Sequence, residues 1–351
     1  MNNPDPSPAL SVVLPTSHGI SNVVRTLRAL RAQTVRHRLE LVIVAPSDRI
    51  TLDSAMTEGF AGVQVIGFDD VTASSNQARV AGIRVARAPI VALAEDHSFP
   101  EPGWAEALLA GHAEGTWAAV GPVVCNANPA TAVSWANFLL EYGPWTESAR
   151  RGAATHLPGH NSSYRRGLLL AYGEKLDALM EAESILQWDL RQNGHQLLLE
   201  PAARTHHLNF SRLSSSIKLR FNGGRQFAAM RSAEWPPLKR LLYVVGAPLI
   251  PLVRLCRSVA LLARWPARRG LLPRLLPVLA AAVAIDGLGE LVGYATGPGP
   301  SSSILGGIEF DRRRSLTRKE QQAYDADTLV NGDDAVRRPR GASANEHRPR
   351  A

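Results

Sequence analysis

Short apolar segments alternate with amphipathic ones through the first 125 residues. Runs rich in β-branched and other apolar residues predict five strands, at residues 10–15, 39–45, 62–68, 89–94 and 117–124. The run at 39–45 is almost continuously apolar, as expected for a strand buried on both faces of a parallel sheet. Helical periodicity begins near Ser21 and recurs over residues 75–88 and 102–112. This alternation predicts an α/β fold built on a doubly wound sheet.

The pattern changes twice after residue 125. Mixed elements, including predicted helices at 132–140 and 181–193, continue the same domain. Beyond residue 235 the chain turns to apolar runs interrupted by proline and arginine, and from residue 311 onward it is polar and nearly free of large apolar groups. We therefore expect a flexible N-terminus at 1–9, a globular domain at 10–232, a helical segment at 233–297 and a disordered tail at 298–351.

Two apolar runs in the helical segment are candidates for membrane contact. Residues 241–253 are short for a bilayer span and contain two prolines, so they favour a re-entrant or interfacial helix pair. Residues 275–294 are long enough to cross, but they include Asp286 and Glu290, which are costly in lipid unless they face protein or water. A buried amphipathic hairpin in a soluble protein remains the alternative interpretation.

The charge balance indicates an anionic partner. The chain has 39 Lys and Arg against 31 Asp and Glu, a net charge of +8, and the segment from Lys218 to Arg274 contains a single acid, Glu234. A basic segment beside apolar runs is typical of surfaces that bind acidic lipid headgroups. No basic run interleaved with stacking aromatics is present elsewhere, so nucleic acid is not an expected partner.

Cysteine usage and the N-terminus indicate the cytoplasmic side of the membrane. Cys125 and Cys256 lack the spacing of a metal knuckle or of a disulfide framework. The chain opens without a basic region followed by an apolar core, so no secretory signal is expected. We expect a protein associated with the cytoplasmic face of the cell membrane.

The strongest candidate for chemistry is the triplet Glu95-Asp96-His97, which directly follows the predicted strand at 89–94. In an open α/β sheet, ligands bind beyond the carboxyl ends of the strands. Hard divalent cations take oxygen ligands, and imidazole is acceptable to manganese-like ions. The triplet therefore predicts a site for Mn²⁺ or Mg²⁺ that neutralises a leaving diphosphate, although an acidic cluster at a strand end also caps helices or faces solvent.

Several segments resemble the nucleotide-binding half of family 2 glycosyltransferases, which have the GT-A fold. They are Ser11 to Thr16, Ala78 to Ile83 and Ile90 to Trp104, while Leu157 to Arg166 resembles the acceptor-side loop of the family. The resemblance covers roughly residues 10–213 and implies a GT-A type doubly wound mixed sheet with a nucleotide-sugar donor. The donor contacts that it implies are Pro15, Thr16, Asp48, Arg79, Glu95, Asp96, His160 and Asn161. The stretch 286–294 is similar to the membrane-proximal ending of many bacterial members.

The metal and base positions depart from the family pattern. Glu95, Asp96 and His97 correspond to the acidic triplet that holds the metal in the family, so His97 replaces the usual last aspartate and the identity of the metal stays open. The family often has a histidine near the metal after a later strand, and His206, beyond the strand-like residues 196–200, is our candidate ligand. The acid that reads the nucleotide base has only Asp48 as a counterpart, at a shifted position, so base specificity does not carry over.

Inversion by a single displacement requires a general base that takes the proton of the acceptor hydroxyl. In the family this base is the aspartate of a Glu-Asp pair that opens a helix ending at a glycine eleven residues later. Glu183 has this spacing from Gly194, and Glu181 is the alternative if the register is shifted. An acid in the first turn of a helix also has a purely structural interpretation, because it stabilises the helix dipole.

The sequence therefore predicts a metal-dependent inverting glycosyltransferase whose acceptor is lipid-linked or a surface glycan. The alternative is a non-catalytic, membrane-attached sugar-nucleotide-binding or assembly protein, which would account for the atypical His97, the missing base-reading acid and Ala182 beside the expected base. A dinucleotide-dependent oxidoreductase is disfavoured, because residues 15–19 after the first strand lack the G-x-G-x-x-G pattern.

Overall fold

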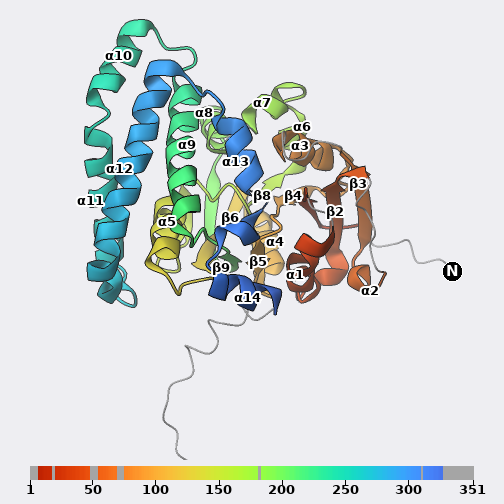
Figure 1. Ribbon diagram of the computed structural model, residues 1–351. Coiled ribbons are helices and arrows are strands. Elements are labelled where there is room, and N and C mark those ends of the chain that lie inside the picture. Colours follow the sequence, from red (N-terminus) through yellow and green to blue (C-terminus); the bar gives the residue numbers. More distant parts are fainter. Residues whose placement is uncertain are drawn as a thin grey trace, which may run out of the picture.

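The computed structural model describes residues 7–17, 20–47, 54–68, 75–180, 183–309 and 311–326. A central sheet carries helices on both of its faces, and long C-terminal helices stand along one side of it (Figure 1). In the described residues the strands are β1 (Leu10–Pro15), β2 (Leu39–Ala45), β3 (Gly62–Gly67), β4 (Ile90–Leu93), β5 (Ser98–Pro100), β6 (Ala119–Asn126), β7 (Gly152–Ala154), β8 (Ser163–Arg165) and β9 (Leu197–His207).

The helices divide into those that cover the sheet and those that follow it. The first group is α1 (Ile20–Arg31), α2 (Ser54–Thr57), α3 (Ser75–Val85), α4 (Trp104–Ala113), α5 (Ala132–Tyr142), α6 (Arg166–Leu170), α7 (Lys175–Leu179) and α8 (Glu183–Gln192). The second group is α9 (Leu213–Arg231), α10 (Pro237–Gly246), α11 (Leu249–Ala263), α12 (Leu272–Thr296), α13 (Ser301–Glu309) and α14 (Arg318–Asp325). Single 3-10 turns include η3 (Gly143–Trp145) and η5 (Arg312–Ser315).

The sheet is mixed, which confirms the predicted α/β class. Its strand order is β3-β2-β1-β4-β8-β6-β9-β5, with β7 added beside β9. β3, β2, β1 and β4 run parallel, whereas β8 is antiparallel to β4 and to β6. Because β1, β2 and β4 are parallel, their carboxyl ends lie at one edge, where a ligand site is expected.

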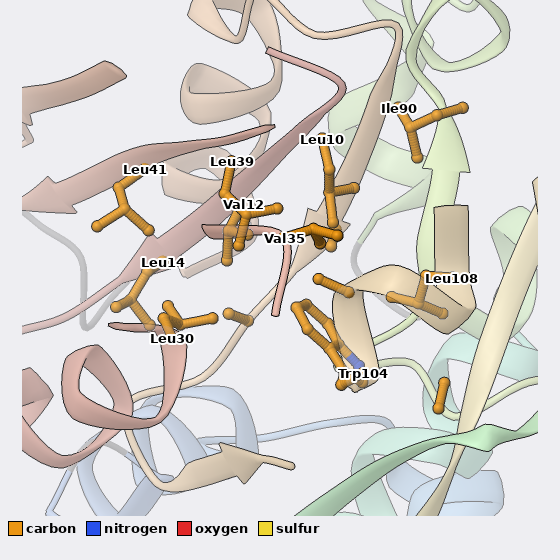
Figure 2. Close-up of a cluster of buried hydrophobic side chains, with 14 of the residues drawn as sticks. Leu10, Val12, Leu14, Leu30, Val35, Leu39, Leu41, Ile90, Trp104 and Leu108 are labelled. Carbon is orange, nitrogen blue, oxygen red and sulfur yellow. The ribbon is translucent and has the colours of Figure 1, made fainter. Parts of the chain in front are cut away.

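Side-chain alternation along β1 connects the two faces of the sheet to different helices. Leu10, Val12 and Leu14 pack on one face with Leu30 of α1 and Trp104 of α4 (Figure 2). The intervening Val13 belongs to the cluster on the other face, which includes residues of α3 and α8. Both faces of β1 are thus buried under helices, as is usual for a strand inside a parallel sheet.

The C-terminal helices are packed against the sheet domain. α12 lies against α9 along its length, and aromatic residues of α5, Trp135 and Phe138, share a core with Leu275 and Leu279 of α12 (Figure 1). The two acids of α12 are buried, and Arg254 of α11 forms ion pairs with both Asp286 and Glu290. These acids therefore face protein. The sequence analysis required them to face either protein or water.

Among the residues that the structure describes, two helical stretches meet the length and hydropathy expected of a membrane span. One comprises residues Arg269–Thr296, which contain an 18-residue window with a mean hydropathy of 1.9. The other is α10 together with α11, which are bent by 59° at the break between them and qualify only as a pair. Length and composition alone are weak evidence for crossing, because core helices of soluble proteins share these properties.

The expectation of a disordered tail from 298 to 351 is wrong for residues 301–309 and 311–326, which form α13, η5 and α14. Leu316 and Tyr324 are buried despite the polar composition of this stretch. A capping box between Thr317 and Glu320 starts α14. Few apolar residues suffice here because the segment covers an existing surface and needs no core of its own. Residues 327–351, like residues 1–6, lie outside the described part of the chain.

Candidate active site

The turn between β4 and β5 carries Glu95, Asp96 and His97. All three side chains are buried, at 5% exposure or less. Backbone hydrogen bonds continue the pairing with β1 past the end of β4, and the hydroxyl of Thr26 on α1 donates to the backbone carbonyl of Glu95. The triplet is therefore held at the carboxyl edge of the sheet, where the sequence predicts it.

Three imidazoles surround the carboxylate of Glu95. Its Oε1 lies 3.1 Å from Nδ1 of His160 and 3.6 Å from Nε2 of His97, and its Oε2 lies 3.5 Å from Nε2 of His207. Neither oxygen of Glu95, nor Oδ2 of Asp96, has a hydrogen-bond partner among the described residues. Buried carboxylate oxygens of this kind are costly unless a cation satisfies them.

The donor atoms in this group suit a divalent cation. Glu95, His97 and His207 each offer one ligand atom, and these atoms all lie within 4.8 Å of one another. One carboxylate and two imidazoles are compatible with manganese-like ions, whereas magnesium prefers oxygen ligands. The residues present thus fit the predicted metal, with His207 as a member that the sequence analysis did not select.

His97 is oriented through both of its ring nitrogens. Nδ1 lies 2.8 Å from Oδ1 of Asp96, and Nε2 lies 2.8 Å from a guanidinium nitrogen of Arg312 in η5. Since arginine only donates hydrogen bonds, Nε2 accepts and Nδ1 carries the proton. The structure thereby assigns the neutral Nδ1-protonated tautomer to His97.

His206, the predicted histidine ligand, is not part of this group. Side chains alternate along a strand, so His206 and His207 of β9 point to opposite faces. His206 lies 2.9 Å from Glu101, whose neighbour Arg204 also bonds Glu147 and Cys125. The hydrogen bond from His206 and the charge of Arg204 lower the pKa of Glu101 to about 2. The histidine beside the acidic triplet is therefore His207.

The loop that precedes β8 brings His160 and Asn161 to the acidic turn. Asn161 has a positive φ of 62°, and its side chain donates to the hydroxyl of Ser98. His160 lies 3.1 Å from a guanidinium nitrogen of Arg79 on α3. Of the predicted donor contacts, His160 thus lies against Glu95, Arg79 lies against His160, and Asn161 bonds Ser98 just after the acidic turn.

The other predicted residues are placed less completely. Pro15 and Thr16 are buried at the carboxyl end of β1, on the edge that carries the triplet. Asp48 and Glu181 lie outside the described residues. Glu183 begins α8, and the structure describes its backbone position only.

Comparison with known proteins identifies the family. Residues 7–225 match the family described as "Glycosyltransferase like family 2". The chain belongs to this family. It is therefore a glycosyltransferase, and the predicted family and enzyme class are confirmed. No curated protein sequence matches the chain significantly.

Solved structures similar to this glycosyltransferase are distant. "GalNAc-T7 with UDP, GalNAc and Mn2+" shares 15% identity at a TM-score of 0.42, over 58% of this chain and 44% of that one, so this chain spans less than half of its length. "S. aureus TarS 1-349 in complex with UDP" shares 12% identity at a TM-score of 0.43, over 82% of this chain and 90% of that one.

Two residues that lie beside the triplet, His207 and Arg312, were not selected in the sequence analysis. His207 was visible beside His206, and extending the strand at 196–200 to the histidines would have allowed alternation to test which of them shares a face with the triplet. Arg312 had no signal, because it lies 215 residues from His97 in a stretch whose composition indicates disorder.

Proposed function

We propose that this glycosyltransferase transfers a sugar with inversion from a metal-bound nucleotide-diphosphate sugar. The observation that carries the proposal is the buried Glu95 carboxylate, which lacks hydrogen bonds within the described residues and lies among imidazoles at the carboxyl edge of the sheet. A divalent cation bound there would neutralise charge on the departing nucleoside diphosphate.

In this proposal Glu95, His97 and His207 hold the cation, and Asp96 orients His97 through its Nδ1 proton. Arg79 lies beside His160 at the rim of the same group and supplies a further positive charge for phosphate oxygens. Pro15 and Thr16 line the nucleotide side at the end of β1, and Asn161 holds the neighbouring loop in place. His207 thus takes the role that the sequence assigned to His206.

We assign the general base to Glu183 at the start of α8. Gln187, one turn further on, is fully buried and bonds both backbone groups of Leu157 and the hydroxyl of Tyr164. This anchor fixes the beginning of α8 against the loop that carries His160. A base at this place would take the proton of the acceptor hydroxyl as the new glycosidic bond forms.

A cavity beside the start of α8 is a suitable place for the acceptor. Its volume is about 380 Å³, and it is lined by Trp145, His156, Leu157, Gly159 and Ser184, the residue after Glu183. An aromatic wall with polar neighbours suits a sugar ring or the polar end of a lipid-linked acceptor.

We further propose that the enzyme lies on an anionic membrane surface through α10 and α11. These helices expose a row of large apolar side chains, which includes Leu238, Leu242, Val245 and Leu249. Exposed basic residues lie on the same helices and shortly after them in the chain, among them Lys239, Arg257, Arg264, Arg269 and Arg274. An apolar face bordered by positive charge fits an interfacial helix pair at the cytoplasmic face, close to a lipid-linked acceptor.

The metal site is tested by replacing Glu95, Asp96 and His97 together with alanine. Manganese-stimulated release of nucleotide from a panel of nucleotide-diphosphate sugars should disappear, because no ligand set remains at the end of β4. Turnover that persists with unchanged chelator sensitivity would refute the metal site.

The base is tested separately by Glu183→Gln. Transfer should fall by about 100-fold or more, the range expected for loss of general base catalysis, while binding of manganese and nucleotide sugar persists. Glu174→Gln, an exposed acid before α7, is the matched control and should leave transfer intact. Near-normal turnover of Glu183→Gln would remove this assignment and leave the metal site standing.

A further inference from the structure

Residues 311–326 fold back over the site, and we call them the C-terminal clasp. They comprise η5 and α14, which lie next to β5 and β9 (Figure 1). The carbonyl of Ser315 accepts hydrogen bonds from the backbone amides of Ser211 and Arg212, just beyond β9. Leu316 is fully buried in a small cluster with Phe99 of β5. The clasp is therefore attached to the strands that border the acidic turn.

The second half of the clasp is attached through polar and aromatic contacts. Glu320 is buried and accepts hydrogen bonds from the amide of Asn128 and the hydroxyl of Ser211. The ring of Tyr324 lies 3.4 Å from the guanidinium carbon of Arg25 on α1. These contacts extend the clasp from β9 to α1, across the edge of the sheet that carries the triplet.

Arg312 is the point at which the clasp enters the site. Its side chain is 5% exposed, and its guanidinium packs 4.2 Å from the centre of the Phe210 ring. From there it donates to Nε2 of His97 over 2.8 Å. An arginine is always charged, so a permanent cation is hydrogen-bonded to His97, the last residue of the triplet.

Arg312 and a divalent metal need the same atom. A neutral imidazole has one lone pair, and in His97 that lone pair is on Nε2, because Nδ1 donates to Asp96. The lone pair accepts a hydrogen bond from Arg312 or coordinates a metal, but it does not do both. Nε2 is also the His97 atom that lies on the side of Glu95.

We propose that Arg312 is an internal cation that occupies the metal position of the donor site, and that binding of divalent metal displaces it and loosens the C-terminal clasp. The inference rests on the metal site proposed above. It makes the clasp a self-blocking contact in the enzyme without metal, because Arg312 holds the His97 atom that a metal would bind. Arrival of metal with nucleotide would then release the segment from the edge of the sheet.

The first test measures manganese binding to the full-length protein without nucleotide, by electron paramagnetic resonance or calorimetry. Arg312→Met should bind Mn²⁺ about tenfold more tightly than the unaltered protein, since the competing charge-assisted hydrogen bond is gone. Arg314→Met, in the same turn but exposed, should bind Mn²⁺ within twofold of the unaltered protein. An unchanged or weaker affinity of Arg312→Met would overturn the proposal.

The second test follows release of the clasp by limited trypsin digestion. The clasp contains Arg318 and Lys319 at the exposed start of α14 as cleavage sites. Addition of MnCl₂ and UDP should accelerate cleavage there in the unaltered protein, and Arg312→Met should be cleaved rapidly without either. Protection of these sites by MnCl₂ and UDP would contradict the proposal.

Tyr324→Ala provides an independent variant should Arg312→Met fold poorly. It removes the contact with Arg25, leaves His97 and Arg312 in place, and should raise manganese affinity in the same direction. Absence of any manganese binding, in all variants and in the unaltered protein, would refute the metal site itself. Manganese binding that is indifferent to both Arg312→Met and Tyr324→Ala would refute only the internal cation.

Discussion

The two adjacent histidines of β9 give a direct residue-scale test of the site. His207→Ala should weaken manganese binding by roughly 10- to 100-fold, because even the partners behind metal ligands contribute that much. His206→Ala should leave manganese affinity within about twofold while lowering the melting temperature, since it breaks only the pairing with Glu101. Calorimetric titration of both variants with MnCl₂ checks this. If both variants lost manganese affinity equally, His206 and His207 could not point to opposite faces of β9 as described.

His112 gives the sheet domain a pH-dependent contribution to stability. Burial, together with the nearby charge of Arg165, lowers the pKa of His112 to about 4. A histidine that stays neutral in the folded state contributes its full stability above the unfolded pKa, and that contribution is lost as the pH falls through the folded pKa. Between pH 6.5 and pH 4 the loss should amount to about 3 kcal/mol.

The measurement is urea unfolding at several pH values for the unaltered protein and for His112→Gln. The variant keeps a polar side chain that can reach Ser163, the present partner of His112, and it does not titrate. Its free energy of unfolding should therefore decline less between pH 6.5 and pH 4. If the free energy of unfolding changed with pH in the same way in both proteins, His112 would not be the group that causes the loss of stability.

Residue-level prediction from the sequence succeeded where a local pattern exists. An acidic triplet directly after a buried strand defines its own place in an α/β sheet, and Glu95, Asp96 and His97 lie where this rule puts them. Local patterns do not report which distant side chains converge, so Arg312 was not predicted. The structure groups His207, and not His206, with Glu95 and His97. The sequence analysis did not compare the two faces because it predicted that the strand ends before the histidines.

At the scale of elements, strands and helices with strong periodicity were predicted closely. β1 and β2 have the predicted bounds, and α8 ends at Gln192, close before Gly194 with its positive φ of 83°. The three-residue strands β5, β7 and β8 were missed, because so short a segment carries no period and forms only through pairing with longer neighbours. β9 continues through Pro201, a residue that normally argues against strand.

The close contact of α9 and α12 depends on glycines in both helices. A Cβ on Gly289 would lie 2.1 Å from the carbonyl oxygen of Phe221, and one on Gly224 of α9 would lie 2.2 Å from the carbonyl oxygen of Asp286. These atoms belong to backbone, which cannot move aside as a flexible side chain does. The two helices therefore pack backbone against backbone, as small residues allow.

Alanine at Gly224 and at its neighbour Gly223 separates packing from helix propensity. Gly224→Ala should destabilise the fold by about 1–3 kcal/mol through overpacking. Gly223→Ala meets no atom within 4 Å in the described structure and should be neutral or stabilise by up to about 1 kcal/mol. Denaturant unfolding of the two variants provides the comparison. Equal changes in the free energy of unfolding would contradict the close approach of the α9 and α12 backbones.

At the scale of the whole molecule, the C-terminal helices are continuous with the sheet domain. α9 and α5 supply the surface on which α12 packs, so the sequence boundary near 232 separates elements that share a core. The acids of α12 are paired inside this assembly with Arg254. α10 and α11 form the outer layer, and the exposed apolar row lies on them (Figure 1). The arrangement favours contact with a membrane through this outer layer over passage of α12 through the bilayer.

Membrane attachment through α10 and α11 predicts a specific dependence on side chains and on lipid charge. Replacing Leu241, Leu242 and Val245 with serine should reduce binding to vesicles containing anionic lipid by at least roughly 30-fold, because three apolar side chains lose their burial. Binding of the unaltered protein should weaken with added salt and with neutral lipid, since the flanking basic residues act electrostatically. Vesicle flotation of the full-length protein measures both effects.

The matched control for that experiment is Ile217→Ser, an exposed apolar residue of α9 outside the row. It should float with vesicles as the unaltered protein does.

If the triple variant also keeps its vesicle binding at high salt, attachment must come from another part of the chain, and a crossing by the residues of α12 becomes the better explanation. If neither lipid charge nor the row matters, the basic segment has a different anionic partner. Because α10 and α11 contribute no residue to the metal group, manganese affinity in solution should be the same in all three proteins, so a loss of vesicle binding can be assigned to the surface alone.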